Sequence, residues 1–224
     1  MFDYTFQWRV VWKHWPELLD AGLLTLQLTL TSIIVGLMIA SVLATFQDSK
    51  NLAAKGAVVT WVGLSRNTPV LLQIYLAYFG LGAFGIHLSP YMAVLMAVTF
   101  NNAGYLTEII RGGMSSVPVS QKLAARGLGL TGLQTYIYII LPQVLRAVFL
   151  PIINQLIWAM LATSVGMIIG LQELTGMTTF LQSQTFRPFE FYFVAACMYF
   201  VIAKIATSLS HVFAAQVFKG GAVK

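Results

Sequence analysis

The sequence predicts an all-α integral membrane protein, a helical bundle of five transmembrane helices. Two observations lead to this fold class. Charged side chains make up 9% of the 224 residues, whereas a soluble domain has roughly 25%. Hydrophobic residues make up 58%, and they gather in long runs without a charge. So few charges cannot cover a 24.6 kDa protein in water without leaving large apolar patches, which excludes a soluble enzyme and a disordered chain.

The uncharged runs locate the spans, because a membrane-spanning helix needs about 20 mainly apolar residues. Long runs end at Asp48, Glu108 and Glu173. The run before Glu108 is long enough for two helices, and residues 80–90 supply a glycine-containing turn between them. A last pair of runs flanks Lys204. The predicted spans are therefore 21–46, 57–83, 90–110, 143–171 and 190–217.

The distribution of Lys and Arg predicts the orientation. Nine basic residues lie in or beside the loops after spans one and three and at the C-terminus, whereas Arg9, Lys13 and Arg187 lie on the other side. By the positive-inside rule, the N-terminus is outside and the C-terminus is cytoplasmic. The net charge of +6 thus reflects topology, and without a basic cluster we expect membrane lipid but no nucleic acid as a partner.

Residues 1–19 are predicted to form an amphipathic helix that lies in the interface on the outer side of the membrane. Trp8, Trp12 and Trp15 share one helix face, and the basic residues of this segment fall elsewhere on the helical wheel. Packing on another subunit is the alternative. Residues 20–218 then form a single transmembrane domain. Its scattered histidines and its single cysteine, Cys197, predict neither a metal site nor another cofactor.

The first span carries a stripe of small and hydroxyl side chains at spacings of three and four residues. In lipid, such residues let two helices approach closely, so helix packing is the favoured role. A pore-lining role is the alternative for the first two hydroxyls. The stripe consists of Thr25, Thr29, Ser32, Gly36, Ala40 and Ala44.

The cytoplasmic loop 112–142 is long for so compact a membrane protein. It contains a short amphipathic stretch in which Ser120 can cap a helix and Gly129 can end it. The loop therefore predicts an exposed cytoplasmic helix held between two spans. It is either an ordinary connecting helix or a helix that a cytoplasmic partner binds and through which the partner moves the two spans.

This loop resembles the EAA loop of permease subunits in ATP-binding-cassette importers. The family pattern is E-A-A, three residues, G, nine residues, then I-x-L-P. Here Leu123, Ala124 and Ala125 are followed by Gly129 and then by Leu141 and Pro142 at the same offsets.

Other stretches narrow the resemblance to the polar amino acid uptake branch, the histidine and glutamine permease type. Residues 66–73, with Arg66-Asn67-Thr68-Pro69 and Gln73, are similar to R-G/N-T-P-x-x-x-Q. The stretches 103–113, 141–155 and 163–175 match further motifs of that branch in order. The resemblance covers about residues 20–215.

The resemblance implies a type I importer permease in the bacterial inner membrane. Leu123, Ala124, Ala125, Gly129, Leu141 and Pro142 would contact a dimer of ATPase subunits. A periplasmic amino acid-binding protein would dock outside. The chain has no G-x-x-x-x-G-K-[ST], so it is not itself an enzyme, and a partner subunit must hydrolyse the ATP.

Two departures from the family pattern affect the expected partners. Leu123 replaces the EAA glutamate, which predicts an apolar coupling contact with one charged pair fewer. Leu161 and Ala162 replace a Lys-Asp pair that the family commonly has in the substrate path. We therefore favour a heterodimer with a second permease that carries the charged contacts. A homodimer for a less charged substrate is the alternative.

Polar residues within the spans are the remaining site candidates. Glu108 and Arg111 are spaced to form an intrahelical ion pair with a structural role. The functional alternative is that they form a gate at the cytoplasmic mouth. Amides at membrane depth need partners. Interhelical bonds are favoured over substrate contact for Asn101, Asn102, Asn154 and Gln155. The resemblance makes Thr163 and Ser164 the best candidates for the substrate path.

Lys204 lies midway along the fifth span, too deep for simple snorkelling. It is expected to face the bundle, a polar partner or a water-filled path. A structural hydrogen bond to a Ser or Thr of a neighbouring span is favoured. Contact with a substrate carboxylate is the functional alternative.

Two other function classes compete with the importer permease. A membrane enzyme is disfavoured because the spans contain no H-E-x-x-H and no paired acids. A secondary transporter or channel subunit for small polar solutes would need its own ion-coupling site and would leave the cytoplasmic loop unexplained. An ATP-driven importer permease needs no ion-coupling site of its own, and it explains the cytoplasmic loop.

Overall fold

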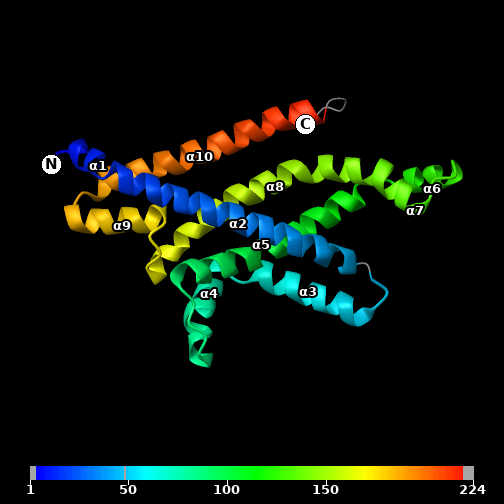
Figure 1. Ribbon diagram of the computed structural model, residues 1–224, viewed down its shortest axis with the longest axis horizontal. Helices are drawn as coiled ribbons and strands as arrows, with labels where there is room; N and C mark the ends of the chain where they lie inside the picture. Colours follow the sequence, from blue (N-terminus) through cyan, green and yellow to red (C-terminus); the bar gives the residue numbers. More distant parts are fainter. Residues whose placement is uncertain (1–3, 48, 219–224) are drawn as a thin grey trace.

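A computed structural model describes residues 4–47 and 49–218. The regular structure in these ranges is entirely helical, as predicted. The helices form an elongated bundle in which α2, α5, α8 and α10 run along the long axis (Figure 1). Among the described residues, three helical stretches are long and apolar enough to cross a membrane, namely Trp15–Gln47, Gly132–Ile169 and Pro188–Val217.

The N-terminal segment contains the short helix α1 (Trp8–Lys13), and α2 (Trp15–Gln47) follows after a break at His14. The first spanning helix therefore begins inside the predicted segment 1–19. The ring of Trp8 packs on that of Phe193, with 5.8 Å between the ring centroids, so α1 contacts the last helix. The proposed position of α1 in the outer interface stays a prediction.

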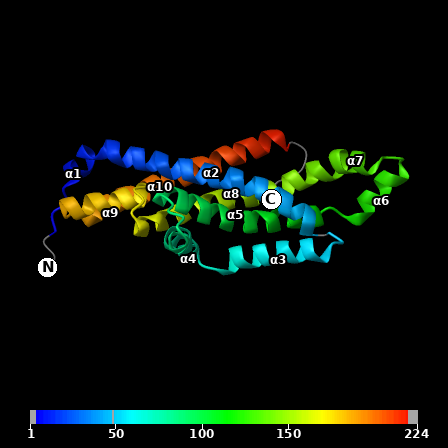
Figure 2. The ribbon, with the colours of Figure 1, turned by 60° about the horizontal axis from the view of Figure 1, so that its bottom comes forward.

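The second predicted span is wrong as a single helix. Residues 57–83 divide into α3 (Leu52–Asn67), α4 (Val70–Tyr75), the π-helical η1 (Leu76–Gly80) and the 3₁₀ turn η2 (Gly82–Phe84). Pro69 causes the break, because its ring pushes the preceding residue out of the helical region. Thr68 accordingly has φ −114° and ψ 140°. Figures 1 and 2 show the chain after α4 turning across the direction of α3.

Helices lie at the positions expected for the later spans, although α5 is not among the three stretches named above. The third is α5 (Pro90–Ser115), whose first turn is capped by Ser89. The fourth is α8 (Leu141–Thr163), which continues into the 3₁₀ helix η4 (Ser164–Ile169). A helix that was not predicted, α9 (Leu174–Thr185), precedes the fifth span, α10 (Pro188–Val217).

The loop predicted to be cytoplasmic contains α6 (Val119–Gly127), α7 (Gly132–Thr135) and the π-helical η3 (Tyr136–Ile140). Pro118 occupies the N-cap position of α6, so the expected cap at Ser120 is wrong. Proline favours this helix start because its φ is already near the helical value and it has no N–H to satisfy. Gly129 ends the segment as expected, with φ 83°, a left-handed conformation that glycine adopts without strain.

The core is built on close contact between α2 and its neighbours, most extensively with α5. All six residues of the stripe from Thr25 to Ala44 are buried, which confirms the packing interpretation. On the other side of α5, Gly104 lies against α3. A Cβ atom at Gly104 would lie 1.8 Å from Ser65 Oγ and 2.9 Å from Ser65 Cβ. The approach of α3 to α5 therefore depends on this glycine.

Gly104→Ala is expected to destabilise the protein by about 1–3 kcal/mol, because the added methyl group must displace Ser65 or the whole of α3. The measurement is the melting temperature of the purified protein in detergent. Gly112→Ala on the same helix, where nothing lies within 4 Å of the added Cβ, is the matched control and should leave the melting temperature unchanged or raise it. Equal effects of the two substitutions would contradict the close approach.

Candidate functional site

A chain of buried side-chain amides crosses the centre of the bundle. Gln155 Nε2 on α8 donates to Asn102 Oδ1 on α5 at 2.8 Å, and Asn102 Nδ2 donates to Ser32 Oγ on α2 at 3.3 Å. The chain thus joins three helices. For Asn102 and Gln155 the expected interhelical bonding is confirmed.

A second polar cluster supplies hydrogen-bond donors to a backbone carbonyl near the C-terminal end of α3. In an unbroken helix the carbonyl of Ser65 would accept a hydrogen bond from residue 69, but Pro69 has no N–H. Two side chains replace it: Asn101 Nδ2 donates to the Ser65 carbonyl at 2.7 Å, and Gln73 Nε2 donates to it at 3.0 Å. Gln73 also donates to Thr68 Oγ1 at 2.8 Å. Asn101 is thus confirmed as an interhelical contact, and Gln73 joins the site although sequence reasoning did not select it.

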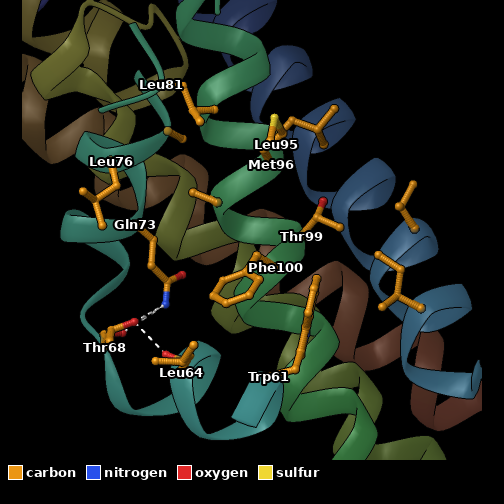
Figure 3. A pocket seen from close by; sticks show the side chains of 14 residues that line it. Trp61, Leu64, Thr68, Gln73, Leu76, Leu81, Leu95, Met96, Thr99 and Phe100 are labelled. Atoms are coloured by element: carbon orange, nitrogen blue, oxygen red, sulfur yellow. Dashed lines mark hydrogen bonds between the residues drawn. The ribbon is translucent and has the colours of Figure 1, made fainter. Parts of the chain in front are cut away.

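A cavity of about 650 Å³ lies beside this cluster, between α2, α3, α5 and the segment from α4 to residue 81 (Figure 3). Its walls are mainly aliphatic and aromatic, and no charged side chain lines it. The lining includes three buried polar atoms without a hydrogen-bond partner in the described part of the chain: Trp61 Nε1, Gln73 Oε1 and Thr99 Oγ1. These atoms have almost no accessible surface, so the cavity wall is essentially apolar and disfavours a charged group.

Several predicted candidates lie outside this cavity. Asn154 is exposed and forms no hydrogen bond within the described residues, so the expected interhelical bond is wrong for this amide. Thr163 and Ser164 lie where α8 changes into η4. Their hydroxyls donate to carbonyls of their own helix, at 2.8 Å to Met160 and 2.6 Å to Leu161.

The predicted pair of Glu108 and Arg111 is present, with Nη2 of the arginine 2.6 Å from Oε2 of the glutamate. Glu108 also accepts from Gln47 Nε2 at 2.7 Å and lies 3.7 Å from Arg66 Nη1. The carboxylate therefore connects the C-terminal ends of α2 and α3 with α5, a wider cluster than the spacing along one helix predicted.

The loop of residues 112–142 presents a shallow pocket and an apolar outer surface. The pocket, of about 420 Å³, brings Ala124 and Ala125 together with Pro142. Leu123 is not part of it: its side chain points outward and is 63% exposed. A hydrogen bond of 2.7 Å from Gln143 Nε2 to Gln121 Oε1 holds α6 to the start of α8.

Lys204 is exposed on α10 and forms no ion pair or hydrogen bond within the described residues. The favoured hydrogen bond to a Ser or Thr of a neighbouring span is therefore wrong. The Nζ atom lies 5.7 Å from the centre of the Phe200 ring, one turn earlier on the same helix. The lysine points away from its own bundle because the buried face of α10 lies elsewhere on the helix.

Glu173 is a buried acid that the sequence marked only as the end of an uncharged run. It is fully buried and caps α9, where Oε1 accepts from the Gly176 N–H at 2.8 Å. Oε2 accepts from the hydroxyl of Tyr199 on α10 at 2.7 Å and from Thr25 on α2 at 3.3 Å. The carboxylate therefore holds three helices together. Its signal in the sequence is an acid in a chain with very few of them, just before a helix.

Comparison with known proteins agrees with this architecture. Residues 32–219 match the family described as "Binding-protein-dependent transport system inner membrane component". The octopine transport system permease protein OccM of Rhizobium meliloti is 34% identical over 208 residues, which are 89% of this chain and 85% of that protein. The glutamine transport system permease protein GlnP of Escherichia coli (strain K12) is 28% identical over 89% of this chain and 92% of its own length.

A solved structure gives the same result for the fold. The crystal structure of an amino acid ABC transporter with histidines superimposes with a TM-score of 0.90 at 29% sequence identity. The match covers 95% of this chain and 100% of that chain. The helical bundle described above therefore has the type I fold of such permeases.

Glu173→Ala is expected to destabilise the protein by about 1–3 kcal/mol, because the buried Gly176 N–H and Tyr199 hydroxyl lose their acceptor. Thermal unfolding of the purified protein measures the loss. Glu173→Gln retains one acceptor oxygen and should lose less. Glu17→Ala is the control, since its side chain is 44% exposed and its hydrogen bond to His14 is local. A loss of stability in Glu173→Ala no greater than in Glu17→Ala would show that the Glu173 carboxylate does not stabilise the fold.

Proposed function

Because this chain belongs to the family of binding-protein-dependent transport system inner membrane components, we propose that it is the permease subunit of an ATP-driven importer for amino acids or their derivatives. The observation that carries the proposal is the coupling loop of residues 112–142. It projects from one end of the bundle between two membrane helices (Figures 1 and 2). Such a projection gives a cytoplasmic partner a lever on both helices.

The loop also supports a separate ATPase subunit as that partner. The outward surface of α6 and the turn after it carries Val119, Leu123 and Leu128, which are all well exposed. An exposed apolar surface of this kind marks a protein contact. With Leu123 in place of an acid, the contact with the ATPase dimer rests on apolar packing. A periplasmic binding protein that delivers the solute to the outer face completes the importer.

The substrate class rests on the relatives and on the polar groups within the bundle. The relatives named above transport octopine and glutamine, an amino acid derivative and an amino acid. The amide chain through Asn102 and the cluster at Asn101 place hydrogen-bonding side chains within the bundle. Asn154, Thr163, Ser164 and Lys204 are further candidates for the path, and the cluster at Glu108 and Arg111 is a candidate for its cytoplasmic gate.

The importer is expected to take up radiolabelled glutamine into proteoliposomes only when ATP is present on the ATPase side and the binding protein is on the other. Uptake should persist when proton and sodium gradients are collapsed. The measurement uses the complete transporter, isolated from its native membrane with its ATPase and binding protein. Uptake driven by an ion gradient in the absence of ATP would instead favour a secondary transporter.

Leu123→Asp is expected to reduce ATP-dependent uptake about tenfold, since an unpaired charge at a desolvated contact costs about 1–3 kcal/mol. Its exposed position predicts an unchanged melting temperature. Leu52→Asp, at an 82% exposed leucine that starts α3, is the matched control and should leave uptake unchanged. An effect of equal size at both positions would contradict a coupling contact at Leu123.

The second permease is expected to be a different protein. Leu161 and Ala162 occupy the positions where the family commonly has a Lys-Asp pair, so this chain offers no charged pair there. The complex purified from native membranes through a tag on this chain should therefore contain a second permease sequence in equal amount, measured by mass spectrometry. Recovery of this permease alone, with two differently tagged copies in one complex, would show a homodimer.

A further inference from the structure

The exposed surface of the C-terminal half of α10 is divided into a polar and an apolar strip. Lys204, Ser208 and His211 are all exposed and follow one another at spacings of four and three residues, so they lie within about 60° around the helix. Ile205, Leu209 and Val212 form a parallel strip beside them, and they are 54%, 65% and 56% exposed. Residues at the same membrane depth thus differ only in the direction in which they face.

The polar strip begins deep in the membrane. α10 contains 30 residues, and Lys204 lies 13 residues before its last residue, about 20 Å from that end. This distance is too great for the lysine to reach the C-terminal interface. Charged side chains at such depth face protein or water rather than lipid.

The chain itself provides no partner for this charge. Within the described residues, Lys204 forms no ion pair or hydrogen bond, and its Nζ atom lies over the Phe200 ring. The acids Glu108, Glu173 and Glu190 already accept hydrogen bonds at other places in the bundle. On the opposite side of α10, Phe213 stacks on Phe149 of α8 at 5.4 Å, so the helix packs on its own bundle through another face.

A second polar group faces outward at similar depth. α8 and α10 run in opposite directions (Figure 1), and Phe149 and Phe213 mark a common level. Asn154 lies five residues after Phe149 on α8, and Ser208 lies five residues before Phe213 on α10. Because the helices run in opposite directions, both residues lie on the same side of that level. Asn154 is exposed and forms no hydrogen bond within the described residues. Outward polar groups at this level therefore occur on two helices.

We infer that the strip of Lys204, Ser208 and His211 lines a water-filled inner half of the translocation path, and that Lys204 binds the carboxylate of the passing solute. This inference rests on the proposed permease function and on the charge bias that puts the C-terminal end of α10 in the cytoplasm. A single structural ion pair would require Lys204 alone. The continuation of the polar strip towards the helix end instead provides hydration and hydrogen bonds along the whole exit. The apolar strip at Ile205 faces lipid or the second permease.

The strip is tested by cysteine labelling in the complete transporter, in inside-out vesicles, with Cys197→Ser removing the exposed native thiol. The probe is a water-soluble, negatively charged methanethiosulfonate. Ser208→Cys and His211→Cys should react at least about tenfold faster than Leu209→Cys and Val212→Cys, because a charged reagent does not enter hydrocarbon. Equal rates at the four positions, or no reaction at Ser208→Cys and His211→Cys, would overturn the inference.

The role of Lys204 is tested by its charge. In the Ser208→Cys background, Lys204→Met should lower the ratio of labelling rates for an anionic over a cationic methanethiosulfonate by about tenfold, whereas Lys204→Arg should retain the ratio. A purely structural lysine would leave the ratio unchanged.

The matching uptake measurement uses radiolabelled glutamine and Lys204→Met in the intact importer, where uptake should fall about tenfold and Lys204→Arg should restore most of it. Full uptake by Lys204→Met would exclude the carboxylate contact. Labelling does not require transport, so its outcome is separate from that of the proposed importer function. Fast labelling of the strip without ATP-driven uptake would overturn only the latter.

Discussion

In the interior of a membrane, a polar group has no water to bond, so each one must find a partner within the protein. The break after α3 shows how this constraint shapes the bundle. Pro69 ends the helix and leaves the carbonyl of Ser65 without its usual donor. Asn101 and Gln73 supply the replacement, and in doing so they fix α4 and α5 against the end of α3. The cavity beside them exists because the chain turns away at this point.

The same constraint explains the other polar clusters of the bundle. Glu173 is tolerated in a fully buried position because an N–H and two hydroxyls donate to it from three helices. The chain from Gln155 through Asn102 to Ser32 pairs each amide across a helix interface. Close packing makes these bonds possible, since the small residues of α2 bring its backbone near enough to α5 for short side chains to meet.

Lys204 and Asn154 differ from these clusters because their side chains are exposed on the surface of the bundle. Lys204 and Asn154 find no partner in the described part of the chain, and both face away from the bundle. A permease works as part of a larger assembly, so groups that one subunit leaves unsatisfied must meet water, solute or a second subunit. The loop between α5 and α8 carries a further outward-facing group, the exposed apolar side chain of Leu123.

The sequence by itself determined the fold class, most of the long helices, the stripe on α2, the pair of Glu108 and Arg111, and the family. These follow from local composition and spacing, which set helix faces and lengths without reference to neighbours. Only the tertiary structure decided that the second span breaks at Pro69 and that Gln73 and Glu173 join distant helices. It likewise decided that Asn154 and Lys204 face outward. Such results depend on which residues, far apart in the chain, are brought within hydrogen-bond distance, and spacing along one helix carries no information on that.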